Sequence, residues 1–454
     1  MMTMPLSEAA HLLATRYEGA DVTFRGVSTD TRTLAEGNLF VALQGPNFDG
    51  HEYLHTAQSQ GAVAAAISES TNTSLPVLRV ADTRIALGQL AKVWRERFSL
   101  PVIGVTGSNG KTTVKEMLAA ILGQSARTLA TRGNLNNDIG LPQTLFRLDD
   151  NDVYAVIEMG ASQAGEIAYL ANIAQPDIAI VTNAGPAHLQ GFGSLAGVAH
   201  AKGEIFESLS RRGRGVRTAV INADDAFAGL WRKAAGRNEI VDFGLEKSAA
   251  VTANANISAA GSDLEVRTPA GDFQFHLALP GKHNVMNALA AIAATTVLDI
   301  SHQQMIAGMQ SLRPVASRLQ FIAGIKHSQI INDTYNANPQ SLNVALDVLR
   351  QQAGQHWLVL GDMGELGDDS LLLHQQMLRS AYDGGVSRIF TLGKLATSAA
   401  QQSDVQTDIF TSMDVLIETL QQQLNENTVV LVKGSRSMAM ERVVDALTMC
   451  EVNS

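Results

Sequence analysis

The sequence contains few of the residues that build cross-linked or membrane-embedded proteins. Cys450 is the only cysteine among 454 residues, which excludes an intrachain disulfide and a cysteine-rich metal site and fits a reducing compartment. No segment approaches the roughly 18–20 consecutive apolar residues of a membrane span. The opening segment MMTMPLSEAAHLL has no basic stretch ahead of a long apolar one, so we expect no signal peptide. These features predict a cytoplasmic protein that does not insert into a membrane.

Positive charge is also scarce. The chain has 34 Lys and Arg against 44 Asp and Glu, a formal net charge of −10, and no run of basic residues. Proteins that bind nucleic acids neutralise many phosphates with such residues, so nucleic acid is not an expected partner. The composition, with 45% hydrophobic residues, is that of an ordinary folded protein. The chain is too long for a single hydrophobic core, so we predict two or three domains.

The pattern of apolar runs divides the chain into three α/β domains: residues 1–98, 99–312 and 313–454, with the last boundary near Arg313-Pro314. The first has short apolar runs separated by polar turns, which predicts a small α/β domain. In the second, buried-type strands alternate with helical stretches, which predicts a parallel, doubly wound sheet. Its predicted strands lie at 102–105, 153–157, 178–181 and 219–221, followed by an antiparallel extension over 251–279 and a helix over 283–298.

The third domain repeats the alternation of strands and helices. Its predicted strands lie at 330–332, 357–360, 388–392 and 429–432, and the pattern predicts a Rossmann-like α/β unit. The fold class is therefore α/β in three parts.

The segment GVTGSNGKTT, residues 104–113, lacks one glycine of the strict nucleotide loop G-x-x-x-x-G-K-[ST]; Val105 stands where that glycine belongs. The alternative to a phosphate site is a tight turn with a solvated lysine. Three glycines followed by Lys-Thr-Thr between a strand and a helix favour phosphate, because inward-turned N–H groups and the helix N-terminus attract anions. We predict a shortened mononucleotide loop made of Gly107, Ser108, Asn109, Gly110, Lys111, Thr112 and Thr113.

Three further residues lie where a reaction could use them. Glu158 ends a predicted strand beside the loop and offers the oxygen ligands that Mg²⁺ prefers. His188 follows a third parallel strand, at the edge where such sheets bind ligands. Lys202 falls in a helical stretch. Taken singly, a capping or solvated carboxylate, a structural histidine and a surface lysine are equally ordinary interpretations, and these stay open.

The motifs together resemble the Mur ligase family, the ATP-dependent amide ligases of peptidoglycan precursor synthesis. The central pieces are TGSNGKTT (106–113), GNLNNDIG (133–140), the strand ending in Glu158-Met159-Gly160, NAGPAHLQGFGS (183–194) and AKGEIF (201–206). The outer pieces are STDTR (28–32), LFVALQG (39–45), LPGKHNVMNALAA (279–291), NDTYNANPQS (332–341), LGDMGELG (360–367) and LVKGSRS (431–437). The resemblance therefore covers nearly the whole chain in order.

Within the family, the motifs are most similar to those of the members that join D-alanyl-D-alanine to UDP-N-acetylmuramoyl-tripeptide. The relatives that add the third amino acid usually carry an Asp-Asn-Pro-Arg motif, which this sequence lacks. Ala316-Ser317-Arg318 stands where the family often shows Pro-Gly-Arg. The alternatives are a third-residue-adding enzyme, a folylpolyglutamate-type ligase and a nucleotide switch or transport ATPase. The last would be expected to carry a full Walker A loop.

The resemblance implies that ATP phosphorylates the terminal carboxylate of the tripeptide and that the amine of D-alanyl-D-alanine attacks the acyl phosphate. It implies catalytic roles for Lys111, Glu158, His188 and Lys202, and Mg²⁺ held by Thr112, Glu158 and His188. It also implies that CO₂ converts Lys202 into an anionic N-carboxylysine, because a plain ammonium would repel the metal.

The resemblance extends these roles to binding residues. Outside the loop, it implies that ATP is contacted by Asn284, Asn287, Arg318 and Asp333. It implies that the nucleotide sugar is held by Ser28, Thr29, Asp30, Thr31 and Arg32, and its peptide by Asn134, Asn136 and Asn137. The acceptor is expected at Tyr335, Asn336 and Asn338. From the residues alone, polar turns and helix caps explain most of these positions equally well. We expect a monomer.

Overall fold

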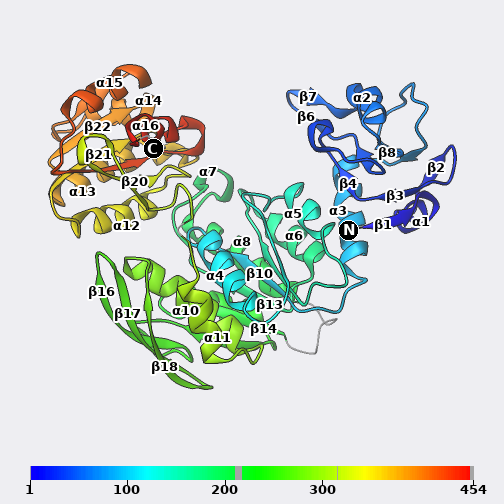
Figure 1. The fold of residues 1–454 in the computed structure, drawn as a ribbon, viewed down its shortest axis with the longest axis horizontal. Helices are drawn as coiled ribbons and strands as arrows, with labels where there is room; N and C mark the ends of the chain where they lie inside the picture. The colour runs from blue at the N-terminus through cyan, green and yellow to red at the C-terminus, as the bar shows by residue number, and fades with distance from the viewer. Residues whose placement is uncertain (1, 210–216, 314, 450–454) are drawn as a thin grey trace, which may run out of the picture.

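The protein forms three lobes arranged in an arc, with the first and last described residues, 2 and 449, in the two outer lobes (Figure 1). The structure is a computed structural model that describes residues 2–209, 217–313 and 315–449. Pro314 of the expected domain boundary and Cys450 lie outside the described residues. Within the described residues, no helix combines the length and apolar character needed to cross a bilayer.

The N-terminal lobe is built on a five-stranded sheet in the order β2-β9-β8-β5-β4, parallel except for the pair β2–β9. A two-stranded sheet, β1-β3, and a hairpin, β6-β7, flank it. The strands are β1 (Thr3–Pro5), β2 (Arg16–Glu18), β3 (Thr23–Arg25), β4 (Val27–Ser28), β5 (Leu39–Val41), β6 (Gln44–Gly45), β7 (Phe48–Asp49), β8 (Ala64–Ile67) and β9 (Val77–Arg79); the helices are α1 (Leu6–Leu12), α2 (Leu54–Ser59) and α3 (Thr83–Arg95).

The central lobe contains a six-stranded, fully parallel sheet in the order β11-β12-β10-β13-β14-β15. Successive residues of a strand face opposite sides, so Val102 and Ile103 of β10 enter two different apolar cores. The strands are β10 (Val102–Thr106), β11 (Thr128–Ala130), β12 (Tyr154–Glu158), β13 (Ile178–Val181), β14 (Thr218–Asn222) and β15 (Glu239–Phe243). The helices are α4 (Lys111–Leu122), α5 (Gly140–Leu145), α6 (Glu166–Ala174), α7 (Leu189–Phe192), α8 (Leu195–Glu207) and α9 (Ala228–Ala235).

An antiparallel sheet and two helices complete the central lobe, as the alternation over 251–279 predicts. The sheet consists of β16 (Thr252–Ser258), β17 (Gly261–Thr268) and β18 (Gly271–Leu277). The alanine-rich helix α10 (Lys282–Thr296) is buried over most of its length and, with α11 (His302–Gln310), packs on α4. The helix that carries Asn284 and Asn287 therefore lies beside the helix that begins at the glycine-rich loop.

The C-terminal lobe holds a second six-stranded sheet in the order β19-β20-β24-β21-β22-β23, parallel except for the pair β19–β20. Its strands are β19 (Gln320–Ala323), β20 (Gln329–Asp333), β21 (Gln355–Leu360), β22 (Arg388–Leu392), β23 (Asp408–Phe410) and β24 (Thr428–Lys433). The helices are α12 (Pro339–Arg350), α13 (Ser370–Asp383), α14 (Lys394–Gln401), α15 (Met413–Gln423) and α16 (Glu441–Leu447). Strands predicted in the second and third domains are present, whereas β11, β15, β19 and β23 went unpredicted because edge strands bury too few side chains to give a clear pattern.

Candidate active site

The glycine-rich loop joins β10 to α4, as expected for a phosphate site. Gly110 caps the helix in a left-handed conformation (φ 84°), and a Cβ there would meet the Asn287 Oδ1 atom at 2.3 Å. Only glycine satisfies both conditions. The ε-amine of Lys111 folds back over the loop and donates to the carbonyls of Gly107 (2.7 Å) and Ser108 (3.2 Å). The loop thus has a cation placed over its carbonyls, while the backbone N–H groups of Ser108 and Asn109 donate to Asn183.

Burial lowers the pKa of Lys111 to about 8, against the opposing effect of the Glu158 charge. The Arg318 guanidinium, which arrives from the C-terminal lobe, lowers the same pKa further. Both cations therefore share one small region, which favours a bound polyanion such as a nucleotide triphosphate.

The segment after β13 supports the loop from the side. Asn183 accepts a hydrogen bond from the backbone N–H of Asn109 (3.0 Å), and the Thr182 hydroxyl donates to the Asn109 carbonyl (2.6 Å). The Ser108 hydroxyl donates to the Gly185 carbonyl (3.1 Å). Two motifs that lie more than 70 residues apart in the sequence are therefore locked together, as the parallel order of β10 and β13 requires.

Glu158 lies at the end of β12, the neighbour of β10, and is 1% exposed. Its Oε1 atom accepts a hydrogen bond from the side-chain amide of Asn136 (2.7 Å). Its Oε2 atom is buried and has no hydrogen-bond partner among the described residues. Because a buried carboxylate oxygen without a partner is costly, this atom is a candidate ligand for a cation.

His188 occupies the N-cap of α7 with a left-handed backbone (φ 54°), a strained conformation for a residue with a side chain. Its Nδ1 atom pairs with the carboxylate of Glu365 from the C-terminal lobe, whose backbone is also left-handed (φ 62°). Burial lowers the pKa of His188, Glu365 opposes this, and the nearby charges of Lys111 and Lys202 reinforce it. A largely neutral imidazole is therefore present at neutral pH, which is the form that binds metals.

Lys202 lies on α8 and is 2% exposed. Its Nζ atom is 5.2 Å from the centre of the Phe192 ring and 3.5 Å from the Ala161 carbonyl. Burial, helped by the charge of Lys111, lowers the pKa of Lys202 to about 7. Much of this lysine is consequently an uncharged, nucleophilic amine at neutral pH.

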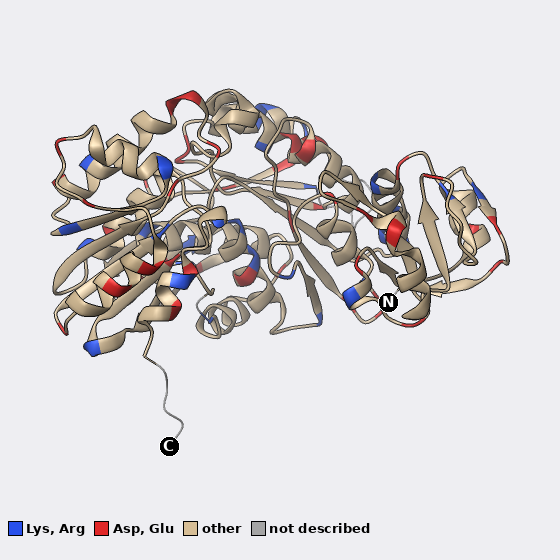
Figure 2. Ribbon diagram, turned by 90° about the horizontal axis from the view of Figure 1, so that it is seen from above, with Lys and Arg blue, Asp and Glu red and all other residues tan. Residues whose placement is uncertain are grey.

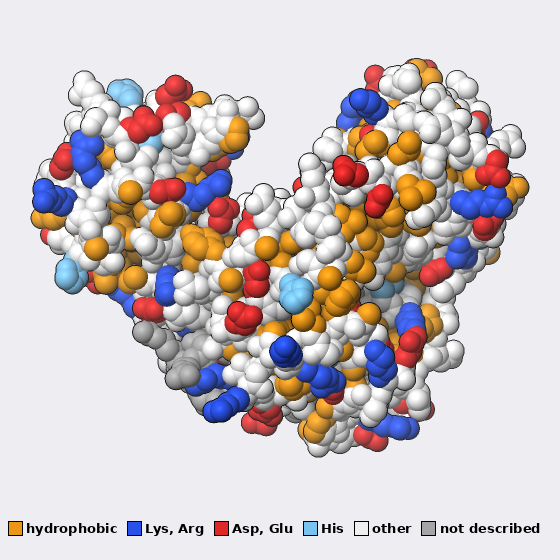
Figure 3. Space-filling view, turned by 180° about the vertical axis from the view of Figure 1, so that it is seen from behind, with side chains coloured by type: hydrophobic (Ala, Val, Ile, Leu, Met, Phe, Trp, Pro, Cys, Tyr) orange, Lys and Arg blue, Asp and Glu red, His pale blue; other side chains and the backbone are white. Residues whose placement is uncertain are grey.

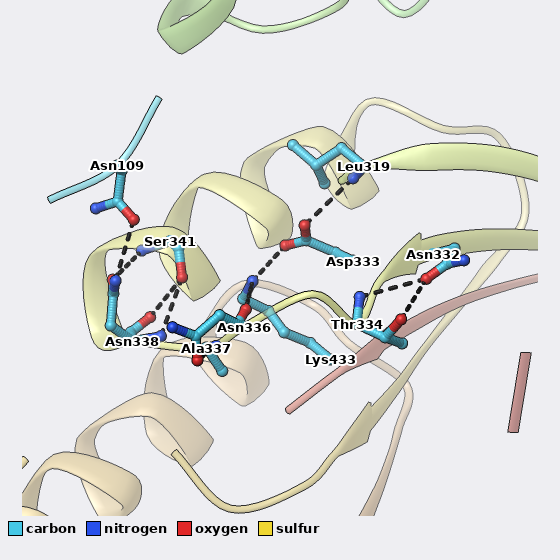
Figure 4. Close-up of polar contacts among 10 residues, drawn as sticks. All are labelled: Asn109, Leu319, Asn332, Asp333, Thr334, Asn336, Ala337, Asn338, Ser341 and Lys433. Atoms are coloured by element: carbon cyan, nitrogen blue, oxygen red, sulfur yellow. Dashed lines mark hydrogen bonds and ion pairs between the residues drawn. The ribbon is translucent and has the colours of Figure 1, made fainter. Parts of the chain in front are cut away.

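The C-terminal lobe reaches the loop through the segment that joins β20 to α12 (Figure 4). Asn109 donates to the Gln340 Oε1 atom (2.9 Å) and accepts from the side-chain amide of Asn338 (3.0 Å). Asn338 also caps α12 through Ser341 in a reciprocal pair of hydrogen bonds. The cap that starts this helix therefore also fixes the segment against the glycine-rich loop.

Two cations anchor the rest of this segment. Arg318 donates to the Thr112 hydroxyl (2.9 Å) and lies 3.9 Å over the ring of Tyr335. Buried Lys433 forms an ion pair with Asp333 and donates to the Asn336 carbonyl (2.9 Å). These contacts bring the predicted ATP and acceptor residues of the third domain to the loop of the second.

Two cavities meet at the loop, and the molecule is visibly hollowed between its outer lobes (Figure 3). The first, about 690 Å³, is lined by the predicted residues Ser108, Asn109, Gly110, Lys111, Asn136, Asn137, Glu158, His188, Arg318, Asp333, Tyr335, Asn336 and Asn338. The second, about 950 Å³, is lined by Asn109, Gly110, Thr113, Asn284, Asn287, Arg318 and Asp333, together with apolar residues such as Phe243 and Met286. The second cavity has the more apolar lining, which suits a nucleotide base, whereas the charged lining of the first suits phosphate and carboxylate groups.

Other predicted residues lie apart from these cavities. Ser28, Thr29, Asp30, Thr31 and Arg32 line neither of them; Asp30 caps the short helix Thr31–Thr33 and pairs with Arg32. Thr29 accepts a hydrogen bond from Gln143 of α5 (2.7 Å). Asn134 is exposed and lines neither cavity. Charged residues of both signs are interspersed along the ribbon (Figure 2).

Sequence reasoning did not single out Gln340, Glu365 or Lys433, although each lies inside a quoted motif. The signal was available for Lys433, which ends a fully buried strand where an unpaired ammonium would be unfavourable. Gln340 and Glu365 contact the central lobe, and such contacts between lobes leave no pattern in a single sequence.

Comparisons with known proteins identify the family. Three family models match: "Mur ligase family, catalytic domain" over residues 23–95, "Mur ligase middle domain" over 105–295 and "Mur ligase, glutamate ligase domain" over 317–436. The UDP-N-acetylmuramoyl-tripeptide–D-alanyl-D-alanine ligase of Escherichia coli K12 is 42% identical over 451 residues, 98% of this chain and 99% of that protein. The chain belongs to the Mur ligase family.

Solved structures agree with this assignment. A crystal structure of MurF from Acinetobacter baumannii matches with a TM-score of 0.91 and 35% identity over 98% of each chain. MurF from Thermotoga maritima in complex with ADP matches with a TM-score of 0.82 and 28% identity, covering 93% of this chain and 96% of that one. The predicted family and the three-part α/β fold class are confirmed, and the domain boundaries at 98/99 and 312/313 stay predictions.

The predicted magnesium site depends on the donor atoms that lie beside the phosphate loop. Among the described residues, no group of three or more His, Cys, Asp or Glu side chains is placed to hold a metal ion. Mg²⁺ commonly uses one or two carboxylates and completes its shell with substrate phosphates and water. The unpartnered Glu158 oxygen beside the phosphate loop therefore fits a magnesium ion that arrives with ATP.

Proposed function

We propose that this Mur ligase joins D-alanyl-D-alanine to UDP-N-acetylmuramoyl-tripeptide at the expense of ATP, as the name of its 42% identical relative describes for that enzyme. The products are the pentapeptide, ADP and phosphate. One observation carries the proposal: Lys111, Glu158 and His188 of the central lobe line the same cavity as the predicted acceptor residues Tyr335 and Asn336. An amide ligase needs this convergence, because phosphoryl donor, acid and amine must meet in one place.

The first step is phosphoryl transfer to the terminal carboxylate of the tripeptide, which depends on positioning and charge stabilisation. In our proposal, the loop N–H groups and Lys111 hold the phosphates, and Asn284 and Asn287 address the base in the second cavity. Arg318 and Asp333 reach the ATP from the C-terminal lobe. The backbone carbonyls that Lys111 now contacts give way to phosphate oxygens, because the ammonium gains more from an anion.

Glu158, Thr112 and His188 are the residues that we propose for Mg²⁺, which would neutralise charge on the transferring phosphoryl group when bound. The Thr112 hydroxyl accepts a hydrogen bond from Arg318 and can still offer a lone pair to a metal ion, because its oxygen has two lone pairs.

We further propose that Lys202 is N-carboxylated. Its uncharged amine attacks CO₂, a nitrogen–carbon bond forms, and one proton leaves to solvent. The result is an anionic carbamate in place of a buried cation. The lowering of the pKa of Lys202 to about 7 supports this proposal, because only the free amine reacts with CO₂.

The second step is attack of the D-alanyl-D-alanine amine on the acyl phosphate. We place the acceptor between Tyr335, Asn336 and Asn338, and the muramoyl peptide at Asn134 and Asn137 of the neighbouring loop. The acceptor residues and Asn137 line the first cavity. The uridine diphosphate end lies at Ser28, Thr29, Asp30, Thr31 and Arg32 of the N-terminal lobe. Closure of the lobes excludes water that would hydrolyse the intermediate. Because the reaction consumes ATP, we place it in the cytoplasm, and we expect a monomer.

A reconstituted reaction tests the proposal. Purified protein receives ATP, Mg²⁺, UDP-N-acetylmuramoyl-tripeptide and D-alanyl-D-alanine, and ADP release and pentapeptide are measured. We expect ADP release that requires both other substrates, and no turnover by Lys111→Ala. Lys233→Ala, which changes an exposed lysine of α9, serves as the matched control and should retain turnover. ATP hydrolysis that is indifferent to D-alanyl-D-alanine would contradict the proposal.

A further inference from the structure

Asn136 is expected to touch the substrate, but its side-chain amide is already committed to Glu158. The Nδ2 atom donates to the Glu158 Oε1 atom at 2.7 Å, which is the length of a strong, charge-assisted hydrogen bond. The other carboxylate oxygen, Oε2, is buried and without a partner within the described residues. The two oxygens of this carboxylate are therefore distinguished: one is held by the protein, and the other is left for a ligand.

The segment that carries Asn136 is tied to the end of β12 at three points. Besides the amide contact, the backbone N–H of Glu158 donates to the Thr131 hydroxyl (3.0 Å), and the N–H of Gly160 donates to the Asn136 carbonyl (2.8 Å). Thr131 is itself fixed, because buried Lys115 donates to its carbonyl (2.9 Å). Asn136 thus approaches Glu158 from a rigid support.

Gly160 makes room for this approach. A Cβ atom at Gly160 would lie 2.9 Å from the Asn136 Oδ1 atom and 3.0 Å from its Cγ atom. Both distances are too short for non-bonded contact. The backbone of Gly160 is not in the left-handed region, so an alanine there is conformationally allowed and acts mainly by pushing the amide of Asn136 away.

We propose that Asn136 is a positioning residue for Glu158: its amide holds Oε1 so that Oε2 faces the phosphate loop as a ligand for the divalent cation. The inference rests on the metal role of Glu158 in the proposed function. Groups that orient a metal ligand typically contribute 10–100-fold to metal affinity. The same loop is expected to contact the muramoyl peptide. We therefore assign Asn136, which contacts Glu158, to the metal site and its neighbours in the loop to the substrate site.

Two variants displace the amide in independent ways. Asn136→Leu keeps the branched shape and the number of heavy atoms and removes the donor, whereas Gly160→Ala keeps Asn136 and moves it. The probe is Mn²⁺ titrated into protein saturated with ADP, with free Mn²⁺ followed by electron paramagnetic resonance. We expect Mn²⁺ affinity to fall about 10–100-fold in both variants. We expect the KM for UDP-N-acetylmuramoyl-tripeptide to change less than about threefold, because the lost interaction is with the protein rather than with the substrate.

Two further variants serve as controls for Mn²⁺ affinity: Asn134→Ala as the negative control and Glu158→Gln as the positive one. Asn134 is exposed on the same loop, so its variant should bind Mn²⁺ like the unmodified protein while raising the KM for the tripeptide substrate. Glu158→Gln should weaken Mn²⁺ at least as much as Asn136→Leu. Thermal melting identifies any variant that fails to fold, and Gly160→Ala then carries the test.

Unchanged Mn²⁺ affinity in both Asn136→Leu and Gly160→Ala, or a raised substrate KM with unchanged Mn²⁺ affinity, would overturn the inference. Its failure is distinguishable from failure of the proposed function. The latter appears as absent D-alanyl-D-alanine ligation by the unmodified protein, whereas the former leaves ligation intact.

Discussion

The central lobe meets its two neighbours in opposite ways. Towards the N-terminal lobe an apolar core crosses the boundary, beside polar contacts such as that between Thr29 and Gln143: α3 residues such as Leu87, Leu90 and Trp94 share one continuous core with Leu141 and Leu170 of the central lobe. The two apolar cores of the C-terminal lobe do not extend into the central lobe, since they contain only residues from 319 onwards. The described contacts across that boundary include polar ones, such as those between Asn109 and Gln340 and between Thr112 and Arg318.

We infer from this difference that the boundary with the N-terminal lobe is rigid, whereas the boundary with the C-terminal lobe can open. An apolar core that crosses between lobes makes them unfold and move as one body, whereas polar contacts exchange readily with water or ligand. The movable boundary is also the one that contains the phosphate loop. A ligase that must admit ATP and then exclude water needs this arrangement.

The largest effect on stability is expected from a cavity in the apolar core that the N-terminal and central lobes share. Leu90→Ala removes a fully buried side chain of α3 and should lower the free energy of unfolding by about 2–5 kcal/mol. Because α3 packs on α5 and α6, hydrogen exchange should accelerate in both lobes together. Exchange measured by mass spectrometry, peptide by peptide, checks this expectation.

Leu420→Ala is the matched control, since Leu420 is equally buried but lies in a core of the C-terminal lobe. Its destabilisation should stay within that lobe. If Leu90→Ala accelerates exchange only in the N-terminal lobe, the two lobes do not share one cooperative core.

A smaller effect is expected at the polar boundary. Arg318→Gln removes the donor to Thr112 and a positive charge near Lys111. A charge-assisted hydrogen bond contributes about 1.5–3 kcal/mol, so kcat/KM for ATP should fall about 10–100-fold.

In the unmodified enzyme, kcat/KM for ATP should also decline above pH 8, as the Lys111 ammonium with its pKa of about 8 loses its proton. Removing the repelling guanidinium raises that pKa, so the decline in the variant should begin at higher pH.

Arg379→Gln controls for the loss of an arginine as such. Arg379 pairs with Asp383 and Asp404 on the surface of the same lobe, where ion pairs contribute little. Equal pH profiles for Arg318→Gln and the unmodified enzyme would mean that Arg318 does not act on Lys111.

The sequence was sufficient for elements that carry a strong local pattern. The buried strands β10 and β13 and the glycine-rich loop were predicted because apolar runs and turn residues report directly on local structure. The convergence of Lys111 with Arg318 depended on family resemblance instead, because the two lie more than 200 residues apart. The partner of Asn136 was missed for a related reason. An asparagine in a turn looks the same in sequence whether it faces solvent, substrate or a buried carboxylate.

The smallest effect is expected from the His188–Glu365 contact. Both side chains are partly exposed, at 30% and 57%, and pairs of this kind contribute about 0–1 kcal/mol. Burial holds the pKa of His188 below its ordinary value, so at neutral pH a mostly uncharged imidazole faces the Glu365 carboxylate and the charge attraction is small. Glu365→Ala should therefore shift the balance between closed and open lobes by about fivefold at most.

Small-angle X-ray scattering measures this shift as a larger radius of gyration of the nucleotide-free protein. Glu246→Ala, which breaks an ion pair with Lys282 inside the central lobe, should leave the radius unchanged. A radius that is equal in both proteins without nucleotide would show that the other polar contacts alone keep the lobes closed.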